Sequence, residues 1–167
     1  MTSPPARRRP ARRQLLGLGA AALVLALDQL SKHGAVTHLA DGQVHPFLPG
    51  VLQLRLVYNT GAAFSLFTGS TAALGLVSLL VAMGLVVWLL SQPRMGPWQL
   101  AGCSVLLGGA LGNGLDRWRL GAVVDFLEFV PVSFPVFNLA DVAINVAVAC
   151  FALDLLLGRS SRPRPSA

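Results

Sequence analysis

Four long apolar segments separated by more polar stretches set the pattern of this chain. Crossing the hydrocarbon core of a bilayer takes about 20 mostly apolar residues in a helix. We therefore predict four transmembrane helices, at about residues 14–34, 71–91, 98–115 and 138–157. The third segment is less hydrophobic and is rich in glycine, with Gly108 and Gly112 at the small-xxx-small spacing that lets helices approach closely.

Two polar stretches between these segments are expected to lie outside the bilayer. Residues 35–69 contain Pro46, Pro49 and, at 51–58, an alternation of apolar and polar residues that is typical of short surface strands. Residues 116–136 are predicted to form a second polar loop. Any chemistry is therefore expected at the membrane face that carries both stretches.

The first apolar segment follows Arg12 and Arg13, an arrangement that also resembles a secretory or twin-arginine signal peptide. No small-x-small cleavage site closes the segment, and three more apolar segments follow. We therefore predict a retained helix. Residues 1–13 are expected to form a disordered basic tail, residues 14–158 a single membrane-embedded domain, and residues 159–167 a second basic tail.

The composition also indicates a membrane protein. Hydrophobic residues make up 54% of the 167 residues and charged ones 12%, against about 25% charged in an average soluble domain. Of the 13 Lys and Arg, five lie before residue 14 and three lie after residue 158. Basic tails can bind nucleic acid, but here they flank apolar segments, as the positive-inside rule describes. We predict no nucleic-acid binding and place both termini in the cytoplasm.

The last apolar segment opens with an acid and two amides. On a helix, Asn138, Asp141 and Asn145 share one face. A carboxylate in or near lipid is costly, which points to a functional role. A structural alternative is that Asn138 and Asp141 form a capping box at the helix N-terminus, where the helix dipole also favours an acid.

A second acid, Asp125, lies upstream in the polar stretch. It could be a loop acid paired with Arg117 or Arg119, or it could meet Asp141. Two carboxyl groups about 3 Å apart share one proton, because they cannot both ionise. The ionised member would take a proton from a water that attacks a carbonyl carbon, and the protonated member would donate to the carbonyl oxygen. We predict such a carboxylate pair.

Other catalytic and metal-binding patterns are missing from the sequence. There is no His-Glu-x-x-His motif, no Cys–His pair and no serine with a base in a matching motif. Cys103 and Cys150 are expected to be small buried hydrophobes. The spacing of His33, His38 and His45 fits no familiar metal site. We therefore predict no metal and no cofactor.

The residues alone leave several alternatives open. Asp28 and Lys32, at i and i+4, could be only an ion pair on the helix surface. Arg117 could hold a lipid carbonyl or phosphate, or the acids of the site. Two other functions compete with hydrolysis. One is a proton-coupled transporter with Asp141 as an intramembrane relay, and the other is a non-catalytic scaffold packed through its third helix.

Five blocks of residues, in this order, resemble the signature of the lipoprotein signal peptidases (signal peptidase II). They are Asp28, Gln29 and Lys32; Asn59 to Ser65; Gly108 to Arg117; Val124 to Phe126; and Phe137 to Asp141. The resemblance implies a bacterial inner-membrane aspartic endopeptidase. Such an enzyme removes the signal peptide from diacylglyceryl-modified prolipoproteins by cleaving before the lipidated cysteine.

The resemblance also implies a fold class and a set of site residues. The fold would be an all-α membrane protein, a four-transmembrane-helix bundle with a small extracytoplasmic β-cradle at about residues 43–69. Asp125 and Asp141 would be the catalytic pair, near the extracytoplasmic face. The residues that line the site and hold the substrate would be Asn59, Gly109, Asn113, Arg117 and Asn138, while Asp28 and Lys32 would support the outer end of the first helix. Expected partners are the prolipoprotein substrate, membrane lipid and globomycin-type inhibitors, and no oligomer is required.

Overall fold

The computed structural model of the chain describes residues 12–61, 71–92 and 94–160, with only the backbone described for residues 158–160. Most of both predicted tails lies outside these residues. So do the end of the expected cradle and the part of the 59–65 block beyond Gly61. The first helix already begins at Arg12, within the stretch predicted as a tail.

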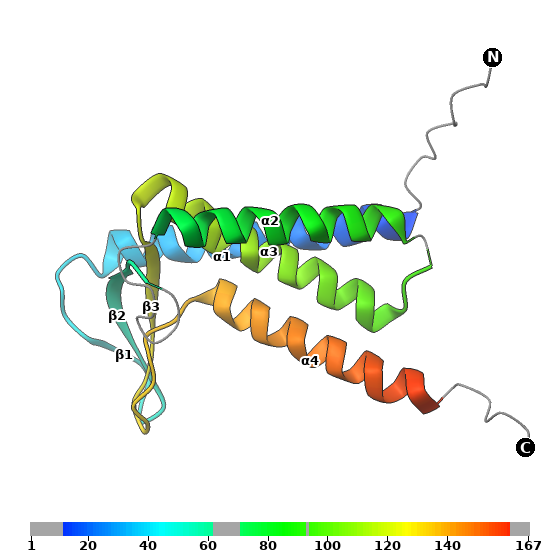
Figure 1. The fold of residues 1–167 in the computed structure, drawn as a ribbon. Helices are drawn as coiled ribbons and strands as arrows, with labels where there is room; N and C mark the ends of the chain where they lie inside the picture. Colours follow the sequence, from blue (N-terminus) through cyan, green and yellow to red (C-terminus); the bar gives the residue numbers. More distant parts are fainter. Residues whose placement is uncertain (1–11, 62–70, 93, 161–167) are drawn as a thin grey trace, which may run out of the picture.

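The described residues form four helices that run alongside one another in alternating directions (Figure 1). They are α1 (Arg12–His38), α2 (Thr71–Ser91), α3 (Pro97–Leu120) and α4 (Leu139–Ser160). The start of α1 and the end of α4 lie at the same end of the bundle, and a small sheet lies at the other end (Figure 1). Each helix matches a predicted segment, and α1 and α3 extend farther toward the sheet than predicted.

The central helix is α3, which packs against all three others. Its glycines permit this close approach. A Cβ on Gly108 would lie 2.7 Å from the backbone oxygen of Ala21 in α1, and a Cβ on Gly112 would press against the Asp28 carboxylate. The predicted close packing through Gly108 and Gly112 is therefore confirmed, with α1 as the partner.

Three helices of the described chain are long and apolar enough to cross a membrane: α1, α2 and the Leu139–Leu157 part of α4. α3 is not among them, because its glycines, Gln99 and Asn113, together with the charged residues at its end, lower its hydropathy. Its place between the other helices accounts for this composition, since side chains shielded from lipid need not be apolar. The structure thus has a mostly helical fold with three candidate spans and a small sheet.

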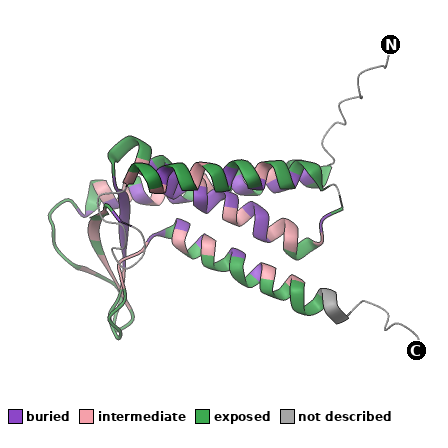
Figure 2. Ribbon diagram, in the orientation of Figure 1, coloured by how far each residue is buried: buried purple, intermediate pink, exposed green. Residues whose placement is uncertain are grey.

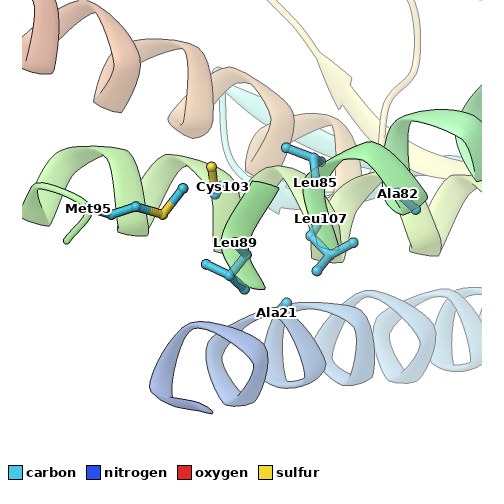
Figure 3. Packing of buried hydrophobic residues seen from close by; sticks show 7 residues of the cluster. All are labelled: Ala21, Ala82, Leu85, Leu89, Met95, Cys103 and Leu107. Atoms are coloured by element: carbon cyan, nitrogen blue, oxygen red, sulfur yellow. The ribbon is translucent and has the colours of Figure 1, made fainter. Parts of the chain in front are cut away.

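An apolar core joins α1, α2 and α3 (Figure 3). It consists of Ala21, Ala82, Leu85, Leu89, Met95, Cys103 and Leu107. Away from this core, the outward faces of the helices are exposed (Figure 2) and carry many leucine and valine side chains. Such large apolar surfaces mark contact with a membrane or a partner. Cys103 and Cys150 are both free and buried, as predicted.

The sheet has the strand order β1-β2-β3 and is antiparallel throughout. Its strands are β1 (His45–Leu48), β2 (Leu52–Asn59) and β3 (Val123–Phe129). The first two lie within the stretch that was expected to form strands. The turn between them contains Gly50, whose φ of 76° is a conformation that glycine adopts without strain.

The prediction of a polar loop over residues 116–136 is wrong in two places. Helix α3 continues to Leu120 and ends at Gly121, whose φ of 70° makes a left-handed C-cap. The chain then forms β3, which pairs with β2. Most of β3 is buried, so its sequence lacks the apolar–polar alternation that identifies a half-buried strand. Strand β3 therefore looks like part of a loop until its partner strand is known.

Candidate active site

Asp125 lies on β3 at the end of the bundle and is only 2% exposed. Its Oδ1 accepts a hydrogen bond from Asn138 Nδ2 at 2.6 Å, and its Oδ2 accepts one from Asn59 Nδ2 at 3.0 Å. The Asn59 side chain is itself oriented, because its Oδ1 accepts the Gly61 N–H. The ion pairs found among the described residues do not include Asp125, so the alternative of a simple pairing with Arg117 or Arg119 is wrong.

Asp141 lies in the first turn of α4. Its backbone N–H donates to Asn138 Oδ1 at 3.0 Å, and the Asn138 N–H donates to Asp141 Oδ2 at 3.1 Å. This reciprocal pair is a capping box, so the structural role predicted for Asp141 is confirmed. The role leaves Asp141 Oδ1 available, and this oxygen accepts a hydrogen bond from Asn113 Nδ2 at 2.8 Å.

Asn138 connects the two acids. It is fully buried, and its one side chain donates to Asp125 through Nδ2 and accepts from the Asp141 backbone through Oδ1. The same Nδ2 also donates to Asn113 Oδ1 at 3.0 Å. A strand and a helix that meet at the end of the bundle are thus tied together at the point where each contributes a carboxyl group.

The surroundings of Asp125 favour its protonated form. Burial raises the pKa of the Asp125 carboxyl to about 6, and the charge of Asp141 acts in the same direction. The hydrogen bonds from Asn59 and Asn138 and the charge of Lys32 lower the pKa but do not outweigh burial. A carboxyl group in this state can donate a proton near neutral pH.

A cavity of about 750 Å³ opens beside the two acids. Its polar end contains Asn59, Asn113, Arg117, Asp125 and Asp141. Its apolar wall comes from β3, from the segment between β3 and α4 and from one face of α4, where Asn145 also lines the cavity; the apolar residues are Val123, Phe129, Phe134, Pro135, Val136, Phe137, Val142, Ile144, Val146 and Ala149. A site with a few polar groups at one end of an apolar wall suits an amphipathic ligand.

Arg117 lies at the polar end of this cavity and is half-buried. Its Nη1 donates to the Asn113 backbone oxygen at 3.3 Å, and its Nη2 donates to the Gly61 backbone oxygen at 3.1 Å. Its Nε is buried and has no partner among the described residues. The Nε–H group of Arg117 could therefore donate a hydrogen bond to a ligand beside the acids.

Asp28 and Lys32 are buried, so the alternative of a surface ion pair is wrong. Lys32 Nζ lies 2.9 Å from Asp28 Oδ2 and 2.9 Å from Asp116 Oδ2. Asp28 Oδ1 accepts the Ala140 N–H at 2.9 Å, next to Asp141. This cluster fixes α1 against α3 and against the start of α4.

The structure separates the predicted site residues into two groups. Asn59, Asn113 and Arg117 line the cavity with the two acids. Gly109 and Asn138 are buried behind it. A Cβ on Gly109 would lie only 2.8 Å from the Ala140 backbone oxygen, so this glycine sets the distance between α3 and the start of α4.

Asp116 is a member of the cluster that the sequence analysis did not assign to the site. It accepts hydrogen bonds from Gln29 Nε2 at 3.0 Å and from the Val124 N–H at 3.2 Å. The sequence feature that could have identified Asp116 is its spacing from Asn113, because residues at i and i+3 share one face of a helix. In the part of the chain that the structure describes, no group of three or more His, Cys, Asp or Glu has the arrangement of a metal site.

Comparison with known proteins gives the family. Residues 20–157 match the model of the family described as signal peptidase (SPase) II. The chain belongs to the signal peptidase II family. A lipoprotein signal peptidase from Parasynechococcus marenigrum (strain WH8102) is 54% identical over 144 residues, covering 86% of this chain and 91% of that protein. Another from Synechococcus sp. (strain RCC307) is 53% identical and covers 85% and 94%, respectively.

Solved structures agree with this family assignment. One bacterial membrane enzyme superposes with a TM-score of 0.80 at 26% identity, covering 91% of this chain and 93% of that one. A second gives a TM-score of 0.76 at 27% identity, with coverage of 84% and 92%. Membership in the signal peptidase II family makes the chain a membrane protease, which rules out the transporter and scaffold alternatives.

Proposed function

We propose that the chain removes signal peptides from diacylglyceryl-modified prolipoproteins, cleaving before the lipidated cysteine, with Asp125 and Asp141 as the catalytic pair. Its relatives are lipoprotein signal peptidases, which supports the substrate class. One observation supports the choice of residues: the side chain of Asn138 bonds both to Asp125 and to the backbone of Asp141. Both acids also line one cavity.

In the proposed mechanism Asp141 is the base and Asp125 is the acid. Asp141 sits at a helix N-terminus, which favours the carboxylate, and its two oxygens accept hydrogen bonds from Asn113 and Asn138. Asp125 has a pKa raised to about 6, so it can hold and donate a proton near neutral pH. A water between the acids gives a proton to Asp141 as its oxygen attacks the scissile carbonyl carbon.

The remaining steps need only the same two groups. Asp125 donates its proton to the carbonyl oxygen as the tetrahedral intermediate forms. The intermediate then collapses: the C–N bond breaks, the amine leaves with the proton that Asp141 had taken, and Asp125 takes back a proton from one hydroxyl of the new carboxylic acid, which restores both groups. No covalent intermediate and no cofactor is required. Asn59 and Arg117, at the polar end of the cavity, are placed to hold backbone or ester oxygens of the substrate through N–H donors.

In this proposal the acyl chains of the substrate lie on the apolar wall of the cavity. It follows α4 away from the acids, from Val142 to Ala149. Since α4 is a candidate membrane span, acyl chains on this wall would remain in the bilayer while the scissile bond reaches the acids. A globomycin-type inhibitor would occupy the same cavity, and a single chain carries all the proposed site residues, so no oligomer is needed.

We further propose that all four helices cross the bacterial inner membrane within a single domain, residues 14–158. Both termini would then be cytoplasmic, with the acids and the sheet at the extracytoplasmic face. Arg12 and Arg94 support this orientation. Arg12 begins α1 and Arg94 lies in the α2–α3 connection, and both of these parts of the chain are at the end of the bundle opposite the sheet (Figure 1). α3 would be the fourth span, shielded from lipid by its neighbours.

The test is cleavage of a diacylglyceryl-modified prolipoprotein by the purified enzyme in detergent, followed on a gel. Asp125→Asn and Asp141→Asn should each lower the rate by about 10²–10⁴-fold, the usual contribution of a general acid or base. Asp154→Asn is the matched control. This acid is also in α4, but it accepts a hydrogen bond from Gln99 near the far end of the helix. Wild-type cleavage by either of the first two variants would contradict the proposal.

A further inference from the structure

Lys32 occupies an unusual position for an ammonium group, buried between α1 and α3 near the sheet end of the bundle, with only 3% of its surface exposed. Its Nζ donates to three oxygens: Asp28 Oδ2 at 2.9 Å, Asp116 Oδ2 at 2.9 Å and Asn113 Oδ1 at 2.8 Å. An ammonium has three donors and no acceptor. Each neighbour of Lys32 must therefore turn an oxygen toward it.

This requirement fixes the orientation of the Asn113 amide. Its Oδ1 faces two donors, Lys32 Nζ and Asn138 Nδ2. Its Nδ2 must then point the opposite way, where it donates to Asp141 Oδ1 at 2.8 Å. A flipped amide would set its N–H groups against both donors and its oxygen against the carboxylate. The flipped amide oxygen could form a hydrogen bond with Asp141 only when the Asp141 carboxyl carries a proton.

We infer that Lys32 is a positioning residue for the proposed cleavage. By holding the Asn113 amide in one orientation, it keeps an N–H donor on Asp141 Oδ1, which stabilises the carboxylate form that a base needs. This inference rests on the proposed function, to which it adds a structural reason for Asp141 to act as the base. Lys32 acts through Asn113 and is absent from the cavity lining.

The charged groups around Asp141 come from three elements. α1 contributes Asp28 and Lys32, α3 contributes Asp116 and Arg117, and β3 contributes Asp125. Removing Lys32 alone would change the net charge and leave Asp28 and Asp116 buried without a cation, which destabilises a fold strongly. A useful variant must therefore remove the donor without changing the charge.

The double variant Lys32→Met plus Asp116→Asn meets this condition. The cluster of Asp28, Lys32 and Asp116 contains two acids and one base, and the double variant leaves one acid and no base, so the net charge is the same. Methionine keeps the length and the packing of the lysine stem. The donor to Asn113 Oδ1 is lost, and the amide is free to turn.

We expect this double variant to lower kcat by about tenfold to a hundredfold, as is typical when a supporting partner is removed, with little change in KM. The acid limb of the rate–pH profile should move to higher pH by about one unit, because Asp141 loses an oriented donor. An unchanged kcat and an unchanged acid limb in a folded variant would overturn the inference. A purely structural loss would lower the amount of active enzyme without moving the limb.

Asn113→Asp is a second variant that keeps every contact to Lys32. Its carboxylate still accepts from Lys32 and Asn138, but when ionised it cannot donate to Asp141. Unlike the double variant, it adds a negative charge beside Asp141, so we expect a folded protein with a loss of cleavage and a shift of the acid limb at least as large as those of the double variant. Cleavage by this variant at the wild-type rate would overturn the inference, even if the double variant fails to fold.

An infrared titration separates this inference from the proposed function, because it needs no turnover. In an Asp125→Asn background, the C=O band of the protonated carboxyl at residue 141 is followed with pH, with Asp125→Asn plus Asp141→Asn as the reference. Adding Lys32→Met and Asp116→Asn should make the band persist to higher pH, and coincident titrations would overturn the inference. If Asp141→Asn instead cleaves normally, the proposed function fails, while the titration still reports what Lys32 does to Asp141.

Discussion

Asn59 on β2 donates a hydrogen bond to Asp125 on β3, with 3.0 Å between Nδ2 and Oδ2. The two residues lie diagonally across the strand pair, since Asn59 pairs with Val123 and Asp125 with Val57. The sheet therefore does more than cover the end of the bundle. It supplies one of the proposed catalytic acids and a group that controls the protonation of this acid.

The first prediction concerns pH. Asp125 must be protonated to act as the acid, so kcat/KM should fall as pH rises through its pKa, about 6 in the free protein. The hydrogen bond from Asn59 lowers this pKa. Asn59→Ala should therefore raise the pKa and move the basic limb to higher pH by about one unit.

Gln53→Ala is the control for this experiment. Gln53 makes a similar amide–carboxylate bond between the same two strands, from Nε2 to Glu128 Oε2 at 2.8 Å, but away from the acids. The basic limb of the rate–pH profile of Gln53→Ala should match that of the wild type. A limb that moves to lower pH in Asn59→Ala would contradict the assignment of Asp125 as the acid.

The second prediction separates the two roles of Asn138. Asn138→Ser keeps a side-chain oxygen for the Asp141 N–H, because serine is a good N-cap, but it cannot donate to Asp125. We expect the helix cap to be kept, a loss of about 1–3 kcal/mol because the buried oxygens of Asp125 and Asn113 lose this donor, and at least about tenfold slower cleavage. Asn138→Ala should lose both functions, with about 1 kcal/mol less stability from the missing cap. Equal cleavage rates in wild type and Asn138→Ser would show that the bond to Asp125 is dispensable.

A third prediction tests whether Gly109 sets the position of α4. Its added Cβ would lie 2.8 Å from the Ala140 oxygen, so Gly109→Ala must push the start of α4 and Asp141 away from α3. A displacement of this kind can slow a reaction by about a hundredfold. Gly84→Ala in α2 is the control, because its Cβ would meet nothing within 4 Å. Full activity of Gly109→Ala in the gel assay would rule out this role.

The fourth prediction concerns the lipid on the substrate. A precursor without diacylglycerol should be cleaved much more slowly than the modified precursor, because it has nothing to place on the apolar wall of the cavity. The comparison uses the same purified enzyme and both precursors at equal concentration. Equal cleavage rates for the two precursors would contradict the proposal that the apolar wall binds the acyl chains.

The fifth prediction is topological. Reporter fusions at residues 45 and 95 should report opposite sides of the membrane, with residue 45 outside. These positions lie in β1 and in the α2–α3 connection, at opposite ends of the bundle. A signal from one side for both fusions would contradict the proposed four spans.

Several features were predictable from the sequence because they depend on local pattern. The four helices follow from runs of apolar residues, and the capping box at α4 follows from the spacing of Asn138 and Asp141. Strand β3 was missed because its pairing with β2 is distant in sequence and its burial on both faces removes the alternation. The burial of Lys32 was missed for a similar reason: the spacing of Asp28 and Lys32 predicts an ion pair but not the helices that cover it.

The position of β3 between α3 and α4 has a consequence for biosynthesis. Asp125 accepts hydrogen bonds from Asn59, which precedes it in the chain, and from Asn138, which follows it, while Asp141 lies on α4, the last helix of the described residues. A nascent or truncated chain that lacks α4 therefore has neither the second acid nor the amide that joins the two. The proposed catalytic pair can therefore form only after the start of α4 has been synthesised and has reached β3.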